Sequence, residues 1–380
     1  MFWQQLIFNI TESVRYSIGY TANEFTSIIR YSLIMFIIFS LLCLNYYTKY
    51  VIAAVVPDSQ DSKNYYRISM VSSHEKPGSP ALFKHGESPT WDPVHQILYF
   101  VDARDNKVHR LDYVSGKISS KQIGYGEVNG ISLIADSRRL LVAVRSSLYI
   151  MNWSVTGDAA LRLLTTLDMG FPDNVINEGK ADPEGRFWAG TKGPQKGDEV
   201  LTDKGTLYLV DQDTYTQPSI KMRPVTAPNG LVWSLNKTVM YFIDSAGQKI
   251  EAFDFDVQKG DISGRRTIID VSNYDYEDAV PDGMTIDDNG MLWIALMFGG
   301  TVLHVDPDSR QVIFGYKLPV SRVSSVCWGG PHLDELFVTT SRDYTDVTSE
   351  PLGGAVFTIR GTGSRGVLPN MFKFENADSY

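Results

Sequence analysis

The chain has 380 residues, with 35 basic and 44 acidic side chains and a formal net charge of −9. This acidic balance argues against nucleic acid as a partner, since nucleic-acid-binding surfaces are basic, and it suits a protein that attracts cations. The two cysteines, Cys43 and Cys327, lie in unrelated segments, so no disulfide framework is expected. The composition indicates no particular oligomeric state.

The first 65 residues are expected to form a separate extension that is hydrophobic and helical. Residues 31–48 carry no charge, and residues 51–56 continue the apolar run beyond Lys49. A stretch of this length is near the lower limit for a membrane-spanning helix. Residues 31–56 therefore favour a membrane anchor, with a cleaved signal peptide or a dispensable extension as alternatives. The predicted location is cytoplasmic or membrane-anchored, with the choice left open.

From residue 66 to residue 380, one pattern recurs six times: a polar residue, a small residue, a short β-like stretch, a turn and a strand rich in β-branched and aromatic residues. The copies are GESPTWDPVHQILYFVD (86–102), NGISLIADSRRLLVAV (129–144), NEGKADPEGRFWAGT (177–191), NGLVWSLNKTVMYFIDS (229–245), DGMTIDDNGMLWIAL (282–296) and SVCWGGPHLDELFVTT (325–340). Leading glycines at 86, 130, 179, 230 and 283 are 44, 49, 51 and 53 residues apart. Such periods indicate propellers or helical solenoids, and no long apolar 3.6-residue period supports a solenoid. We therefore predict an all-β fold, a six-bladed β-propeller over residues 66–380.

Several features outside the repeated polar position have structural interpretations. Trp188 and Trp293 occupy matched positions and are expected in the core, and Arg186 is expected at a blade edge. Residues 192–205 are polar and rich in glycine, which predicts either a solvated loop or a flap over the mouth of the propeller. A product starting at Met70 would still contain every repeat.

Equivalent positions of the repeats would form a ring at one end of the propeller axis. These positions are Glu87, Asn129, Asn177, Asn229 and Asp282. Taken singly, Asn-Gly and Asp-Gly are common turn dipeptides, but the shared register favours a site. Carboxylate and amide oxygens suit Ca²⁺, Mn²⁺ or Mg²⁺, and carboxylates also bind Zn²⁺. Few protein ligands would leave room for water and substrate, which predicts metal-assisted hydrolysis of a lactone or ester.

Six motifs resemble the regucalcin family, also called senescence marker protein or gluconolactonase-like, over about residues 85–370. They are GESPTWDP, INEGKADPEGRFWAGT, APNGLVWSLNKTVMYFIDS, FDFDVQKGDISGRR, VPDGMTIDDNGMLWIA and SSVCWGGPHLDELFVTTSRD. The resemblance implies a six-bladed propeller with one divalent cation in its central channel, and several family members hydrolyse sugar lactones. It also implies the metal ligands Glu87, Asn229 and Asp282. Asp282 would in addition accept and donate the proton, and Asn177 would contact the substrate.

The chain departs from the family pattern beside the ring. Val175 stands where the family has an arginine, and Glu178 stands where it has an aspartate. The family's mid-loop glutamate falls nearest to Leu201, with Glu199 two residues earlier. Val175, Glu199 and Asn177 are the candidate substrate contacts. Because valine offers none of arginine's hydrogen-bond donors, we expect a more apolar lactone or ester than a sugar lactone.

Other functions stay open from the sequence. A non-catalytic calcium-binding regulatory protein would use the same ring of residues. An enzyme like paraoxonase or strictosidine synthase would need more calcium ligands, and a paraoxonase would also need catalytic histidines near the ring. Here His85 precedes its glycine, and no histidine occupies a ring position. Regeneration of a luciferin-like compound is compatible with the leading family.

Overall fold

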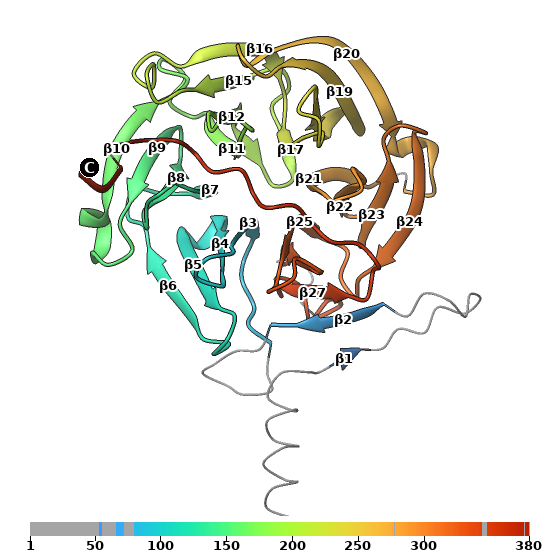
Figure 1. Ribbon diagram of the computed structural model, residues 1–380. Helices are drawn as coiled ribbons and strands as arrows, with labels where there is room; N and C mark the ends of the chain where they lie inside the picture. Colours follow the sequence, from blue (N-terminus) through green and yellow to red (C-terminus); the bar gives the residue numbers. More distant parts are fainter. Residues whose placement is uncertain are drawn as a thin grey trace, which may run out of the picture. The chain divides into compact units, whose positions relative to one another are not determined.

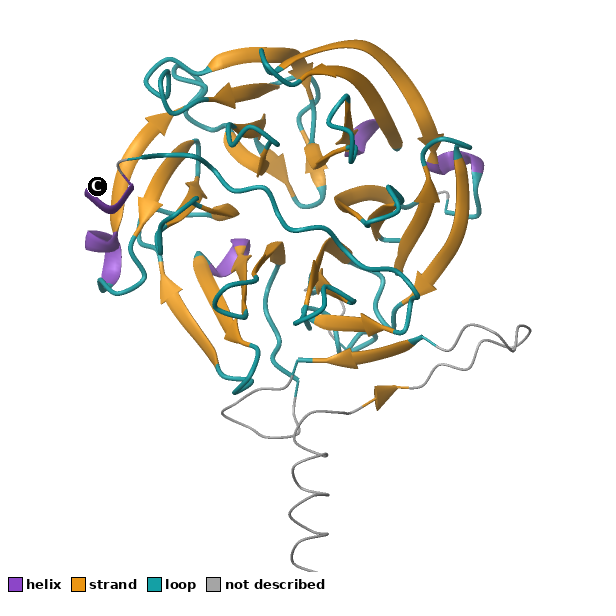
Figure 2. Ribbon diagram, viewed as in Figure 1, coloured by secondary structure: helices purple, strands orange, loops and turns teal. Residues whose placement is uncertain are grey.

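A computed structural model describes residues 53–54, 66–71, 80–276, 278–343, 348–375 and 377–379. These residues form six antiparallel sheets around a central axis, and the predicted all-β, six-bladed propeller is confirmed (Figures 1 and 2). The helices of the described residues are short 3-10 turns, and none of them is long and apolar enough to cross a membrane. Apart from residues 53–54, the candidate anchor at 31–56 lies outside the described residues.

Five blades each contain four strands, ordered along the chain from the axis outward. The strands are β3 (Gly86–Asp92), β4 (Ile97–Asp102), β5 (Lys107–Asp112) and β6 (Ile118–Gln122); β7 (Val128–Leu133), β8 (Leu140–Val144), β9 (Ser147–Met151) and β10 (Leu161–Thr166); β11 (Val175–Ala181), β12 (Phe187–Lys192), β15 (Gly205–Val210) and β16 (Ser219–Val225); β17 (Pro228–Trp233), β18 (Val239–Asp244), β19 (Lys249–Asp256) and β20 (Asp261–Asp270); β21 (Val280–Ile286), β22 (Leu292–Met297), β23 (Thr301–Asp306) and β24 (Gln311–Lys317).

The sixth blade is built from both ends of the propeller sequence. Its strands are, from the axis outward, β25 (Val323–Gly329), β26 (Glu335–Thr340), β27 (Phe357–Arg360), β2 (Arg67–Met70) and β1 (Ala53–Ala54). In the register, Arg67 lies opposite Arg360 and Met70 lies opposite Phe357. A product starting at Met70 would therefore contain every repeat but would lack nearly all of the strand that closes the ring.

In two blades, an aspartate stabilises the turn that precedes the second strand and also holds a buried tryptophan of that strand. In one of them, Asp182 accepts hydrogen bonds from backbone N–H groups within the turn and, at 3.1 Å, from the indole N–H of Trp188. Asp287 does the same for Trp293. Both indoles are fully buried, as predicted for core residues. Arg186 donates to two backbone carbonyls of the neighbouring blade, at 2.8 and 3.1 Å, which agrees with its predicted place at a blade edge.

Each of the six inner strands contains an irregularity in its pairing close to the end where it enters the channel. The register of β3 shifts between Glu87 and Thr90, and that of β11 shifts between Ile176 and Glu178. Equivalent shifts occur in β7, β17, β21 and β25. A bulge of this kind turns a side chain away from its regular direction. In five blades it includes the ring position, and in β3 it begins directly after Glu87, so the backbone itself directs these side chains.

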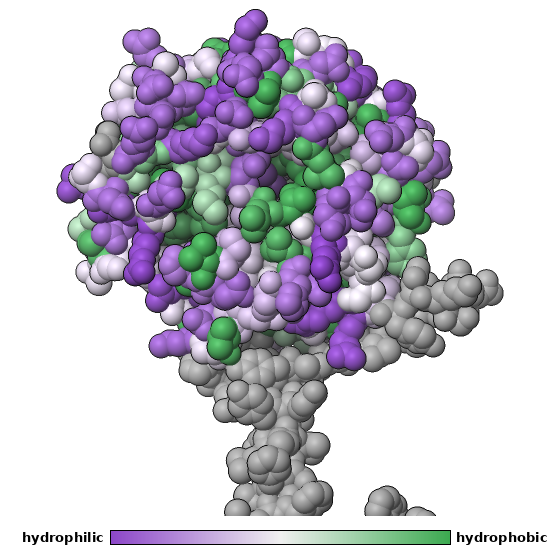
Figure 3. Space-filling view, in the orientation of Figure 1, coloured by the Kyte–Doolittle hydropathy of each residue, from purple (hydrophilic) through white to green (hydrophobic). Residues whose placement is uncertain are grey.

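Residues 361–375, called the strap below, cross the other end of the channel (Figure 1). Backbone hydrogen bonds fix the strap at both of its ends, to the sixth and fifth blades at Gly366 and Arg365 and to the second and third blades at Phe372 and Lys373. Phe372 is fully buried. On this face of the molecule, apolar atoms gather near the centre, where the strap crosses (Figure 3).

Candidate metal and substrate site

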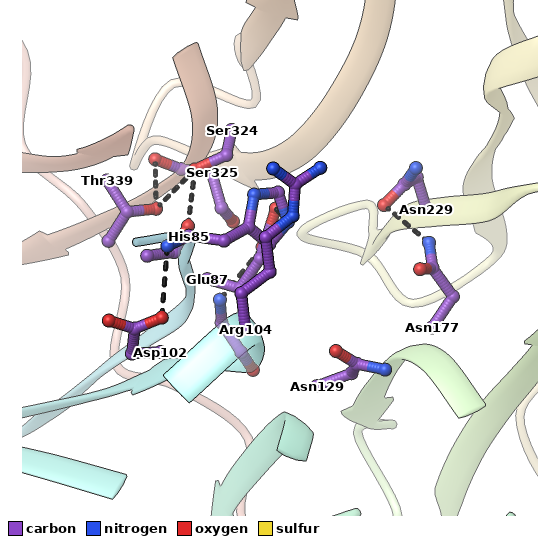
Figure 4. Close-up of polar contacts among 12 residues, drawn as sticks. His85, Glu87, Asp102, Arg104, Asn129, Asn177, Asn229, Ser324, Ser325 and Thr339 are labelled. Carbon is purple, nitrogen blue, oxygen red and sulfur yellow. Dashed lines mark hydrogen bonds and ion pairs between the residues drawn. The ribbon is translucent and has the colours of Figure 1, made fainter. Parts of the chain in front are cut away.

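A polar cavity of about 460 Å³ opens at the end of the channel where the inner strands begin; we call it the mouth cavity. All five ring residues predicted from the repeat register line it: Glu87, Asn129, Asn177, Asn229 and Asp282. In Figure 4, the side chains of Asn177 and Asn229 lie across the cavity from those of Glu87 and His85. The propeller thus brings together residues that span almost 200 positions of the sequence.

The amide of Asn229 is held by its neighbours. Its Nδ2 donates to Oγ of Ser245 over 2.7 Å, and that hydroxyl donates to the carbonyl of Pro281 over 2.6 Å. Asn229 Oδ1 accepts from Nδ2 of Asn177 at 3.3 Å. Asn177 Nδ2 also donates to the carbonyl of Pro228 at 2.9 Å. Because Ser245 fixes the nitrogen, the amide oxygen of Asn229 faces Asn177 and the cavity.

Two carboxyl groups, those of Glu87 and Asp282, line the mouth cavity, and that of Glu178 lines a second cavity of the channel. Burial raises the pKa of Glu87 well above its usual value, and repulsion from Asp282 and then from Glu178 raises it further. Burial and repulsion from Glu178 likewise raise the pKa of Asp282, against a smaller lowering by Lys192. No described residue donates a hydrogen bond to the Asp282 carboxylate. The site therefore concentrates negative charge that the surrounding protein does not neutralise.

The donor atoms fit a hard divalent cation. Among the described residues, no group of three His, Cys, Asp or Glu side chains lies close enough together to hold a metal. A cation here would therefore depend on one amide oxygen, from Asn229, together with the carboxylates of Glu87 and Asp282. Oxygen donors with two negative charges are the set that Ca²⁺, Mg²⁺ and Mn²⁺ prefer. A bound cation would also relieve the repulsion between the two carboxylates.

Two of the candidate substrate residues do not line the mouth cavity. Val175 is the first residue of β11 and pairs with Lys192 on β12. Glu199 lies on β14 (Glu199–Val200) and is exposed, while its neighbours Asp198 and Val200 line the cavity. Lys192 lines the cavity next to Val175 and brings a positive charge to the mouth.

The sixth ring position, which the sequence interpretation missed, is Ser324. It falls within the register shift of β25, is fully buried, and donates to the carbonyl of Gly86 over 2.6 Å. A signal for it exists in the sequence, since Ser324 precedes Trp328 by the same four residues that separate Glu87 from Trp91. Because its hydroxyl makes that contact, Ser324 has a structural role, joining the sixth blade to the first.

His85 also belongs to the mouth cavity, although it precedes its glycine in the sequence. Its Nε2 lies 3.9 Å from Oε1 of Glu87. Burial, and then the positive charges of Arg104, Lys192 and Arg322, lower the pKa of His85 to about 3. The imidazole is therefore neutral at physiological pH and lies beside a candidate metal ligand.

The segment at 192–205 forms part of the wall of the cavity. It contains the hairpin of β13 (Gln195–Lys196) and β14, and Asp198 at its tip accepts from both guanidinium nitrogens of Arg322 at 3.1–3.2 Å. Arg104 lies 3.8 Å from the same carboxylate. Of the two interpretations of this segment, the structure supports the flap.

The fold and the ring together define a propeller with a polar site at the entrance of its channel. The family described as SMP-30/Gluconolactonase/LRE-like region matches residues 85–342, and the chain belongs to this family. It is 34% identical to regucalcin of Xenopus laevis over 294 residues, which cover 76% of this chain and 95% of that protein.

Two solved structures extend the comparison. A luciferin-regenerating enzyme matches with a TM-score of 0.74 and 27% identity, over 81% of this chain and 99% of that one. A calcium-binding protein, regucalcin from Agrobacterium tumefaciens, matches with a TM-score of 0.69 and 24% identity, over 77% of this chain and 95% of that one. At that identity, the second match supports the fold alone.

Proposed function

We propose that this protein is a metal-dependent hydrolase of lactones or esters. The observation that carries the proposal is the pair of buried carboxylates, Glu87 and Asp282, which repel one another beside the fixed amide oxygen of Asn229. A structural role would not require uncompensated charge in the channel, because burying charge without a partner is costly. Membership of a family that includes gluconolactonases supports the same conclusion.

In this mechanism, Glu87, Asn229 and Asp282 would hold the cation. When bound, a divalent cation polarises the carbonyl of an ester and makes water easier to deprotonate. Asp282 accepts the proton of the attacking water as the new carbon–oxygen bond forms. It then returns this proton to the leaving oxygen as the ring bond breaks, so that a lactone and one water give one hydroxy acid.

The other residues of the mouth cavity position the substrate. The Nδ2 of Asn177, which points at Asn229 in this structure, is the group that would donate to an oxygen of the substrate. The flap, fixed by Asp198 on Arg322, restricts access to the mouth. Val175, which pairs with the cavity-lining Lys192, offers no hydrogen-bond donor to a sugar hydroxyl, so we expect aliphatic lactones to be better substrates than sugar lactones.

The test is a hydrolysis screen with the full chain after metal removal and reconstitution with Ca²⁺, Mn²⁺, Mg²⁺ or Zn²⁺. Aliphatic and sugar lactones are compared side by side, with D282N as the inactive control. Full activity of D282N would exclude the proposed proton transfer. Activity restricted to sugar lactones would exclude the proposed role of Val175.

A second candidate is a non-catalytic calcium-binding protein that uses the same ligands. The observation that favours it is the apolar Val175 beside the mouth, which weakens the case for a polyhydroxylated substrate. Stoichiometric Ca²⁺ binding by isothermal titration calorimetry, without turnover of any lactone or ester, would support this function over hydrolysis.

A further inference from the structure

The channel holds a second cavity at its other end, where the inner strands finish. Its volume is about 290 Å³, and strap residues 367–370 form part of its wall; we call it the strap cavity. This volume is at the lower end of the size range of small-molecule sites. Hydrolysis at the mouth cavity makes no use of it.

The lining of the strap cavity is largely apolar and aromatic. It includes Trp91, Ile131, Trp233, Ile286, Val326 and Trp328. The three tryptophans are almost fully buried, and no described residue accepts a hydrogen bond from their indole N–H groups. Trp188 and Trp293, which lie outside this cavity, each have an aspartate partner. Buried indole N–H groups normally have a hydrogen-bond acceptor. Three indole N–H groups that lack an acceptor and belong to the lining of one cavity therefore need an explanation.

Lys180 adds a positive charge to this lining. Its Nζ donates to the carbonyl of Met284 over 2.8 Å, and no ion pair joins it to a described carboxylate. An ammonium group has three N–H donors, so the carbonyl leaves two of them for another acceptor. Glu178 also lines the strap cavity; its Oε1 accepts from the backbone of Gly179 at 2.8 Å, and no ion pair joins it to Lys180. The indole N–H groups and the two remaining N–H donors of Lys180 thus lack an acceptor among the described residues.

A route into the strap cavity lies along its rim. Leu235, in the turn after β17, and Leu368, on the strap, line the cavity and are 49% and 61% exposed. The apolar atoms near the centre of this face in Figure 3 agree with an apolar rim. An amphiphilic molecule could therefore reach the cavity without unfolding the strap.

We propose that the strap cavity is a second ligand site, which binds a small monocarboxylate with an apolar body. The carboxylate accepts from Lys180 and from the indole N–H groups, and the apolar body packs among the aliphatic and aromatic side chains. Charge-assisted hydrogen bonds from the ammonium group favour a carboxylate over a neutral acceptor. Burial raises the pKa of Glu178, which favours the neutral form of that side chain and leaves Lys180 available to the ligand. A volume at the lower end of the range for small-molecule sites limits the ligand to a small acid, for which octanoate serves as the probe.

The experiment is isothermal titration calorimetry of the full chain with octanoate and with octanamide, a neutral molecule of the same length. We expect one octanoate per chain and at least tenfold weaker binding of octanamide. The K180M variant should reduce octanoate affinity to that of octanamide. The K259M variant, which removes an exposed lysine on another blade, should leave both affinities unchanged.

A second variant keeps the test independent of the folding of K180M. L368D changes an exposed strap position, so it should fold, and its charge at the rim should weaken octanoate binding but not octanamide binding. Absence of octanoate binding, or equal octanoate affinity in wild type, K180M and L368D, would overturn the proposal. Glu87 and Asp282 line the mouth cavity and not the strap cavity, so E87Q and D282N should still bind one octanoate per chain. Failure of the hydrolase proposal would therefore not affect this one.

Discussion

Asn177 donates its side-chain N–H to Oδ1 of Asn229 over 3.3 Å, so the candidate substrate residue already contacts the oxygen that would bind a cation. In the proposed site, the amide of Asn177 would therefore face the substrate, and the amide of Asn229 behind it would face the metal. Their roles can be separated because only Asn229 would touch the cation.

We expect N229A to weaken divalent-cation affinity by about 100-fold or more, since it removes one of the three ligands. N177A should change that affinity by less than about threefold and should instead raise KM. Calorimetric titration with Ca²⁺ and lactone kinetics measure the two effects. Equal loss of cation affinity in both variants would contradict the separation of roles.

Ser245 should act as a positioning residue, because its hydroxyl accepts from Asn229 Nδ2 and fixes which end of the amide faces the cavity. Loss of a group that orients a metal ligand typically lowers affinity about 10–100-fold. S245A should show this loss in a cation titration, whereas S309A, in an exposed turn, should not. S245T, which keeps the hydroxyl, should recover part of the affinity.

Asp282 should destabilise the metal-free protein at neutral pH. Burial and Glu178 raise the pKa of Asp282 in the folded chain, so the folded state holds this proton more tightly than the unfolded state does. The resulting stabilisation is complete below the unfolded pKa and is lost as pH rises through the folded pKa. D282N should therefore raise Tm at neutral pH in the presence of EDTA, as followed by circular dichroism.

The difference in Tm between D282N and wild type should shrink toward about pH 4, where the wild-type carboxyl is protonated. D288N, at an exposed turn position, provides the control and should leave Tm unchanged at both pH values. Addition of Ca²⁺ should raise the Tm of wild type but not that of D282N. A lower Tm for metal-free D282N at neutral pH would contradict the charge argument.

Arginine at position 175 should shift the substrate preference. Val175 pairs with Lys192, which lines the mouth cavity, so a longer side chain there can extend toward the substrate. V175R should lower KM for sugar lactones by about tenfold relative to wild type, because its planar fork can bond two oxygens at once. V175M controls for side-chain length, and an equal gain in V175M would rule out hydrogen bonding as the cause.

The strap should contribute strongly to stability through Phe372. This side chain is fully buried and packs on Phe187 and Phe374. F372A should lower the free energy of unfolding by about 3–5 kcal/mol. L368A, at an exposed strap position, should change it by no more than about 0.5 kcal/mol. Chemical denaturation of both variants measures the contrast.

The ring could be predicted from the sequence because a propeller places equivalent residues of every repeat around one axis. The polar residue that begins each repeat thus predicted the five positions that line the mouth cavity. The family resemblance then selected Glu87, Asn229 and Asp282 among them as the expected metal ligands. The bulges that direct these side chains leave no comparable pattern. Ser324 was missed because serine is an inconspicuous residue at that position.

Contacts between distant segments could not be read from the repeat. Asp198 reaches Arg322 across 124 positions of sequence, and nothing local to either residue indicates the pairing. The strap cavity depends on Leu368 and its neighbours crossing from one blade to another. Such contacts follow from tertiary geometry, and local periodicity carries no information about them.

The pairing of β2 with β27 has a consequence for how this protein is made. During synthesis, residues 67–70 emerge well before residues 357–360. The early strand β2 therefore stays unpaired while the other blades form. Unpaired strand edges are prone to join other chains, and large proteins are most vulnerable while such edges are exposed. Ribosome stalling or truncation before residue 360 should therefore leave an open ring that requires chaperones, even though five blades are complete.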